Sequence, residues 1–140
     1  MELPPRKNRM GKRILLVDDD SAVRDSIAMV LESVGFQVDQ ADQGVSGMRL
    51  LRANEPELVI TDILMPQKEG IETIREIRSV LPETPIIAIS GSVEPLADYL
   101  KMARTFGATA ILAKPFDPAV LLDLVNRLLS ARGATADVPQ

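Results

Sequence analysis

The sequence predicts a doubly wound α/β domain with a five-stranded parallel sheet, and three features of the chain carry this prediction. Five short apolar segments alternate with five segments of helical periodicity, and turn residues separate them. Three of the apolar segments (ILLV, LVIT and IIAI) are apolar at nearly every position, which is typical of strands covered on both faces. Right-handed crossovers then favour the strand order 2-1-3-4-5 with helices on both faces of the sheet.

The expected strands are short and lie at intervals along the whole chain. They fall at residues 14–17, 36–41, 58–61, 86–90 and 110–113. A segment of helical periodicity follows each of them, as the crossover connections of a parallel sheet require. The sequence therefore predicts a flavodoxin-like sheet and not an antiparallel one.

Glycine, proline and aspartate mark where the helices begin and end. The helices are expected at residues 21–34, 45–55, 71–81, 94–107 and from 118 onward. The first has Asp20 as its N-cap and ends at Gly35. The last opens with Asp117 as N-cap and Pro118 in the first turn, where proline is well tolerated.

Length and composition fit one folded domain with a proper core. The chain has 140 residues, of which 46% are hydrophobic and 26% charged. We expect a flexible basic leader at residues 1–12, a folded domain at 13–132 and a flexible tail at 133–140. No linker to a second domain is visible, so we expect a protein that acts alone.

Several classes of function are excluded or disfavoured by composition. The chain has no cysteine and no histidine, which excludes disulfides, thiolate and imidazole metal sites, and histidine-based acid–base chemistry. The net charge of −4 disfavours nucleic acid as a direct partner, although the basic leader leaves a weak contact with nucleic acid or acidic lipid open. No apolar run approaches the roughly 20 residues of a membrane span and no signal peptide opens the chain, so we expect a cytoplasmic protein.

Polar and charged side chains gather where the expected strands end. In chain order these are Asp18, Asp19 and Asp20, then Asp62, then Ser90, then Lys114. Strands one, three, four and five are neighbours in a 2-1-3-4-5 sheet, so these groups should converge at one edge. Each group alone is better explained as a turn or capping residue, but together they predict a functional site.

Converging carboxylates repel one another unless a cation joins them. Mg²⁺ prefers oxygen ligands and is often held by one or two carboxylates together with a phosphate. A carboxylate beside the metal can act as the nucleophile that forms an aspartyl phosphate, and lysine and serine can then bind the phosphoryl oxygens. The site residues therefore predict Mg²⁺-dependent phosphoryl chemistry.

At this point four segments resemble a known family. The segments ILLVDDD, VITDILMPQKEG, AISGS and AILAKPF closely resemble the receiver domains of two-component response regulators, over residues 13–132. The motif D-x-x-M-P-x-x-x-G, from Asp62 to Gly70, is specific when it occurs with the acid pair and the Lys-Pro dipeptide. The resemblance implies a phosphorelay switch that catalyses its own phosphorylation and dephosphorylation, and no other enzyme activity.

The resemblance implies a role for each site residue. Asp62 is the phosphoacceptor, and it binds Mg²⁺ together with Asp18, Asp19 and the backbone carbonyl of Leu64. The switch hydroxyl is that of Ser90, and the phosphate-binding lysine is Lys114. The Lys114–Pro115 peptide is expected to be cis, as it is in the family.

The resemblance also implies partners. A histidine kinase or phosphotransfer protein would donate the phosphoryl group. A downstream protein would bind the face formed by residues 94–107, 110–113 and the helix from 118, and the chain would be a monomer or a weak phosphorylation-dependent dimer.

One departure from the family pattern is Ile111, which stands where the family usually has Tyr or Phe. Another is the connection at residues 90–95, which is about two residues longer than in compact members.

Three other interpretations remain open. The chain could be the receiver portion of a larger regulator with a DNA-binding or enzymatic output. An aspartyl-phosphate phosphatase would use a D-x-D pair, which Asp18 and Asp20 formally supply, but it would also need a substrate cap, for which no segment is long enough. A nucleotide-binding flavodoxin-like module would need a phosphate-cradling loop after the first strand, where three acids would instead repel phosphate.

Overall fold

A five-stranded sheet forms the centre of the computed structural model, which describes residues 12–63, 69–91, 101 and 104–137. All neighbouring strands are parallel and their order is β2-β1-β3-β4-β5, as predicted. The strands are β1 (Arg13–Val17), β2 (Gln37–Ala41), β3 (Leu58–Asp62), β4 (Ile86–Ser90) and β5 (Ala110–Ala113).

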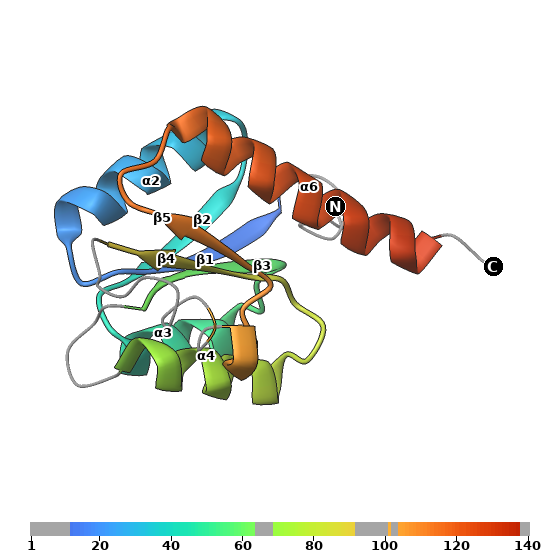
Figure 1. Ribbon diagram of the computed structural model, residues 1–140, viewed down its shortest axis with the longest axis horizontal. Helices are drawn as coiled ribbons and strands as arrows, with labels where there is room; N and C mark the ends of the chain where they lie inside the picture. Colours follow the sequence, from blue (N-terminus) through green and yellow to red (C-terminus); the bar gives the residue numbers. More distant parts are fainter. Residues whose placement is uncertain (1–11, 64–68, 92–100, 102–103, 138–140) are drawn as a thin grey trace, which may run out of the picture.

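Helices cover both faces of the sheet (Figure 1). They are α2 (Ser21–Ser33), α3 (Gly44–Ala53), α4 (Glu69–Val80) and α6 (Pro118–Asp137). Helices α2 and α6 lie on one face, and α3 and α4 lie on the other (Figure 1). Residues 101 and 104–106 are also helical. They belong to the expected fourth helix, of which most lies outside the described residues.

The core is divided in two by the sheet. Successive residues of β1 point to opposite faces: Ile14 and Leu16 pack in the cluster under α2 and α6, whereas Leu15 and Val17 pack in the cluster under α3 and α4. Every residue of β3 and β4 is buried. The prediction that the near-continuous apolar segments are covered on both faces is therefore confirmed.

The predicted helix caps are confirmed. The Asp20 carboxylate accepts hydrogen bonds from the backbone N–H groups of Ala22 (3.0 Å) and Val23 (3.3 Å), and thereby caps α2. The Asp117 carboxylate accepts one from the Ala119 N–H at 2.8 Å and does the same for α6. Capping satisfies N–H groups that have no partner inside the helix. The turns that lead from β1 into α2 and from β5 into α6 are therefore well defined.

Helix α6 is longer than the sequence indicated. It continues to Asp137, whereas we expected the folded domain to end at residue 132. Three alanines in the last part of the helix explain the difference, since alanine has the highest helix propensity and needs no periodic apolar pattern to continue a helix. The last turns project beyond the sheet (Figure 1). Within the described ranges, no helix combines the length and apolar character needed to cross a membrane.

Two arginines stabilise the edge of the sheet where the strands begin. The Arg13 guanidinium binds both carboxylate oxygens of Asp39, at 2.8 and 2.9 Å, and also the side-chain oxygen of Gln37. Just before β4 and β5, Arg78 of α4 donates to the backbone carbonyls of Leu81, Pro82, Thr84 and Gly107. These contacts join loops that are remote in sequence and satisfy carbonyls that helix and strand ends leave unpaired.

Candidate functional site

The opposite edge, where the strands end, collects the candidate site residues. Asp18 and Asp19 follow β1, and Asp62 is the last residue of β3. The last residue of β4 is Ser90, and Lys114 directly follows β5. Parallel pairing in register places all these strand ends side by side, as the sequence predicted.

Three carboxylates and one ammonium group form the centre of the site. Asp18, Asp19 and Asp62 each offer a carboxylate oxygen, and these oxygens lie within 4.8 Å of one another. The Lys114 Nζ lies 3.3 Å from an oxygen of Asp18 and 3.3 Å from an oxygen of Asp62. Asp18 and Asp62 are buried, whereas Asp19 is exposed. One lysine facing three acids leaves the site with an excess of negative charge.

The electrostatics of the site reflect this excess. Burial raises the pKa of the Asp18 carboxyl above its ordinary value, and the nearby Asp62 carboxylate adds to the effect, although the Asp20 N–H and Lys114 oppose it. For Lys114, burial lowers the pKa, but the Asp62 and Asp18 carboxylates together outweigh burial and the net shift is upward. A buried acid whose pKa is raised by burial and by a neighbouring carboxylate is typical of functional sites.

The turn between β1 and α2 holds its acids firmly. The Asp18 N–H donates to the Ala41 carbonyl at 3.1 Å, which continues the pairing of β1 with β2. The Asp18 carboxylate accepts from the Asp20 N–H at 2.9 Å. The Arg24 guanidinium donates to the Asp18 carbonyl at 2.7 Å. Sequence reasoning missed Arg24, whose signal is a cation early in α2, where the positive end of the helix dipole disfavours one.

The donor set suits a hard divalent cation. Three carboxylate oxygens close together, two of them from buried residues, are the ligands that Mg²⁺ prefers, and the site's negative charge needs compensation. The residues present therefore fit the metal that the sequence predicted. Asp20 does not belong to this set, because its carboxylate is engaged in capping α2. That arrangement removes the second acid of the D-x-D pair that a phosphatase would require.

Comparison with known proteins decides the family. Residues 14–126 match the model of the response regulator receiver domain. The chain belongs to that family. It is 37% identical over 122 residues to the response regulator MprA of Mycobacterium sp. (strain KMS), covering 86% of this chain and 51% of MprA. It is 36% identical over 126 residues to the CAI-1 autoinducer sensor kinase/phosphatase CqsS of Vibrio cholerae, covering 88% of this chain and 18% of CqsS.

A solved structure supports the same conclusion. The crystal structure of a CheY-like response regulator receiver domain protein from Methanospirillum hungatei JF-1 matches with a TM-score of 0.81 and 29% identity, covering 89% of this chain and 98% of that one. The receiver fold predicted from the sequence is thus confirmed. The chain spans about half the length of the MprA relatives that it matches.

The structure describes two of the three remaining predicted site features, Ser90 and the Lys114–Pro115 peptide, but not Leu64. Ser90 is buried; its hydroxyl donates to the Gly91 carbonyl at 3.2 Å, and its own carbonyl accepts from the Lys114 N–H at 2.7 Å. The Lys114–Pro115 peptide is cis, as predicted. Leu64, whose carbonyl we expected at the metal, lies outside the described residues.

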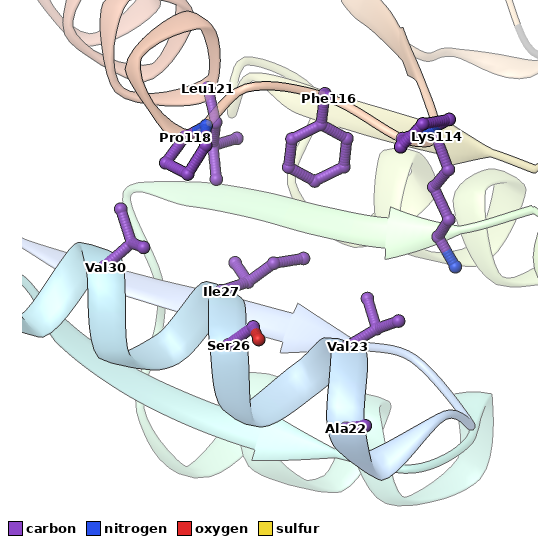
Figure 2. Close-up of a pocket in the computed structure, with 10 residues that line it drawn as sticks. Ala22, Val23, Ser26, Ile27, Val30, Lys114, Phe116, Pro118 and Leu121 are labelled. Atoms are coloured by element: carbon purple, nitrogen blue, oxygen red, sulfur yellow. The ribbon is translucent and has the colours of Figure 1, made fainter.

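An apolar cavity of about 440 Å³ lies beside the site (Figure 2). Helix α2 contributes Val23, Ile27 and Val30 to its wall, and the segment from β5 into α6 contributes Phe116 and Leu121, among others. Lys114 lies at one end of the cavity, with its amine extending away from Phe116 (Figure 2). The cavity and the acidic site therefore share Lys114.

Proposed function

We propose that this receiver accepts a phosphoryl group onto Asp62 in a Mg²⁺-dependent reaction and so switches a protein-interaction surface. One observation carries the proposal. Asp62 shares a pocket with the carboxylates of Asp18 and Asp19, and its own carboxylate lies 3.3 Å from the Lys114 amine. A nucleophile, a cation-binding acid pair and a charge for the incoming oxygens are thereby present together.

The residues would divide the chemistry as follows. An Asp62 oxygen attacks phosphorus, and the new O–P bond forms as the bond between phosphorus and the donor breaks. Lys114, which has two carboxylate partners before the reaction, turns one of its three N–H donors to the transferred phosphoryl oxygens. Asp18, Asp19 and Asp62, with the Leu64 carbonyl, would hold Mg²⁺, which when bound neutralises the acids and the charge on the phosphoryl oxygens.

Ser90 would report the modification. It ends β4 and accepts a hydrogen bond from the backbone of Lys114, so that the two residues are linked before any phosphoryl group arrives. Among the described residues its hydroxyl bonds only to the adjacent Gly91 carbonyl, at a long 3.2 Å, a contact that a phosphoryl oxygen can replace at little cost. Ile111 is half-buried beside the core under α3 and α4, so that repacking there, without an aromatic ring, would pass on the change.

The partners follow from the position of the site. A histidine kinase or phosphotransfer protein would donate the phosphoryl group in the cytoplasm, with the apolar cavity beside Lys114 as its contact surface. A downstream protein would bind the face of residues 94–107, β5 and α6. The side chains of β5 are only partly buried there. Apart from its own phosphorylation and dephosphorylation, the receiver would catalyse no reaction.

The relatives bear on whether the receiver acts alone. MprA is about twice as long as the matched region, and CqsS is longer still. Both a stand-alone switch and a receiver that controls an attached output therefore fit the site, because each uses the same phosphorylated aspartate and differs only in what the switched face contacts.

Acetyl phosphate and Mg²⁺ test the proposal directly. Intact-mass analysis should show one added phosphoryl group on the wild-type chain and none on Asp62→Ala. Asp42→Ala, which changes an exposed acid near the same edge, is the matched control and should be modified like wild type. Undiminished uptake by Asp62→Ala would rule out Asp62 as the acceptor.

A further inference from the structure

Arg24 is the feature of the site that the proposed function leaves without a role. Its Nη1 donates to the Asp18 carbonyl at 2.7 Å, the short distance of a charge-assisted hydrogen bond. Asp18 itself is fully buried, so this carbonyl would be costly to leave without a donor. The backbone N–H of Arg24 meanwhile donates to the Asp20 carbonyl at 2.9 Å, as part of the first turn of α2.

These contacts fix the backbone on both sides of Asp19. On one side the Asp18 peptide is held by Arg24 and by Ala41. On the other side Asp20 is held by its N–H bond to the Asp18 carboxylate and by the cap that it forms on α2. The Asp19 side chain is exposed, and among the described residues no hydrogen bond to its carboxylate is present. Its place in the acid cluster therefore depends on where the backbone holds the Asp19 Cα.

The position of Arg24 on α2 indicates that its main role is the hydrogen bond to the Asp18 carbonyl. A positive charge near the N-terminus of a helix opposes the helix dipole, at a typical cost of 0.3–1 kcal/mol. The Asp20 carboxylate, which caps this end of α2, offsets only part of that cost, and no other acid lies within the first turn. A positive charge close to a cation site also repels the cation. Both effects disfavour an arginine at this position. The hydrogen bond to the Asp18 carbonyl must therefore provide a benefit that outweighs them.

We propose that Arg24 is a positioning residue for the divalent cation: by holding the Asp18 carbonyl, it fixes the peptide from which Asp19 projects and so preorganises the acid pair. The inference rests on the proposed function and adds a residue outside the metal's own ligands. Groups that orient metal ligands in this way commonly change metal affinity by 10–100-fold when they are removed.

The sign of the change in affinity separates positioning from charge. Arg24→Met keeps the aliphatic stem but removes the donors and the charge. If Arg24 acted only through its charge, Mg²⁺ would bind Arg24→Met more tightly than wild type, since a repelling cation has gone. If it positions the acids, Mg²⁺ should bind about tenfold more weakly. Arg24→Lys keeps a charged donor and should recover most of the wild-type affinity.

Mg²⁺ titrations followed by the backbone amide signals of residues 18–20 would measure these affinities. Arg52→Met is the charge control, because Arg52 is exposed, lies on α3 and pairs only weakly with Glu76 at 3.6 Å. Its Mg²⁺ affinity should stay within about twofold of wild type. Metal-free spectra and urea melts establish that each variant is folded before it is titrated.

A second readout uses phosphorylation by acetyl phosphate. At limiting Mg²⁺, Arg24→Met should react several-fold more slowly than wild type, and saturating Mg²⁺ should restore the rate to within about twofold. Equal or tighter Mg²⁺ binding by Arg24→Met would overturn the proposal, as would Arg24→Lys binding as weakly as Arg24→Met. A wild-type chain that neither binds Mg²⁺ nor takes up a phosphoryl group would be a different result, because the proposed function itself would then fail.

Discussion

The two edges of the sheet use charge in opposite ways. At the edge where the strands begin, Arg13 binds both oxygens of Asp39 and Arg78 donates to several backbone carbonyls, although burial lowers the pKa of Arg78 and the Arg13 Nε has no hydrogen-bond partner among the described residues. At the edge where the strands end, three acids face one lysine, and the pKa of Asp18 is raised by burial and by its neighbour Asp62. The first arrangement stabilises the fold, and the second stores unfavourable energy that a ligand can release.

The difference shows why one edge can be a site and the other cannot. Arg78 satisfies carbonyls of two separate segments, residues 81–84 and Gly107, so there is little free energy left for a ligand to gain. Asp18, Asp19 and Asp62 stay close at a cost in repulsion, and a divalent cation or a change in their charge relieves that cost. The comparison predicts that similar substitutions at the two edges will change stability in opposite directions.

The largest expected effect belongs to Arg78. Arg78→Met keeps much of the stem but leaves the carbonyls of Thr84 and Gly107 without their donor, and it should lower the free energy of unfolding by about 3 kcal/mol. Urea melts measure the loss. Arg52→Met is the matched control, since its ion pair with Glu76 is exposed, and it should cost less than about 0.5 kcal/mol. Equal losses for the two variants would mean that the hydrogen bonds of Arg78 to these carbonyls contribute little.

The contrast between the edges is only half visible in the sequence. The strand order and the convergence of Asp18, Asp62 and Lys114 could be predicted, because each residue directly follows an apolar segment and parallel strands end at the same edge. Acids and lysine beside strands leave a pattern in the sequence. The excess of carboxylates over cations at this edge could therefore be recognised from the order of the residues alone.

The contacts of Arg78 and Arg24 leave no such pattern. Arg78 binds the Gly107 carbonyl across 29 positions in sequence, and its acceptors are backbone atoms, which every residue possesses. Arg24 likewise binds a backbone carbonyl. Which carbonyl an arginine reaches depends on how helices pack on the sheet, and periodicity does not specify this. The end of α6 was misplaced for a related reason, because its alanines extend the helix without an apolar stripe.

The same substitution made at each edge should have effects of opposite sign. Asp62→Asn removes one charge from the crowded pocket while Lys114 keeps Asp18, so the metal-free protein should become more stable by about 1 kcal/mol. Asp39→Asn leaves Arg13 without its carboxylate and should become less stable by about 1–2 kcal/mol. Urea melts at matched ionic strength measure both. Changes of the same sign would remove the distinction between the edges.

Mg²⁺ should distinguish Asp62→Asn from Asp39→Asn further. By binding only the folded state, it should add about 1.4 kcal/mol to wild-type stability at ten times its dissociation constant and about 2.7 at a hundred times. Asp39→Asn should gain the full increment, and Asp62→Asn far less, because one acid of the site has lost its charge. NaCl at equal ionic strength is the control. A full increment for Asp62→Asn would show that the cation binds elsewhere.

The smallest expected effect is a pH dependence that belongs to one buried acid. Unfolded, the Asp18 carboxyl has the ordinary pKa of 3.8, and in the folded protein burial, together with Asp62, raises it. Between these two values the folded state binds more protons than the unfolded state, so the free energy of unfolding falls as the pH rises. Lys114 behaves differently: its raised pKa stabilises the fold below 10.5, and this stabilisation is lost as the pH rises through the folded value.

Asp18→Asn isolates the acid arm of this dependence. Other carboxyls also titrate there, so the quantity to follow is the stability of wild type minus that of Asp18→Asn, measured in metal-free urea melts from pH 3 upward. This difference should fall with rising pH and then level off once Asp18 is ionised in the folded state, because only wild type must then carry a buried charge. Asp123→Asn, at an exposed position on α6, should give a nearly flat difference. A rising difference for Asp18 would mean that Lys114 and the Asp20 N–H outweigh burial, and the strand-end edge would then be as well compensated as the other.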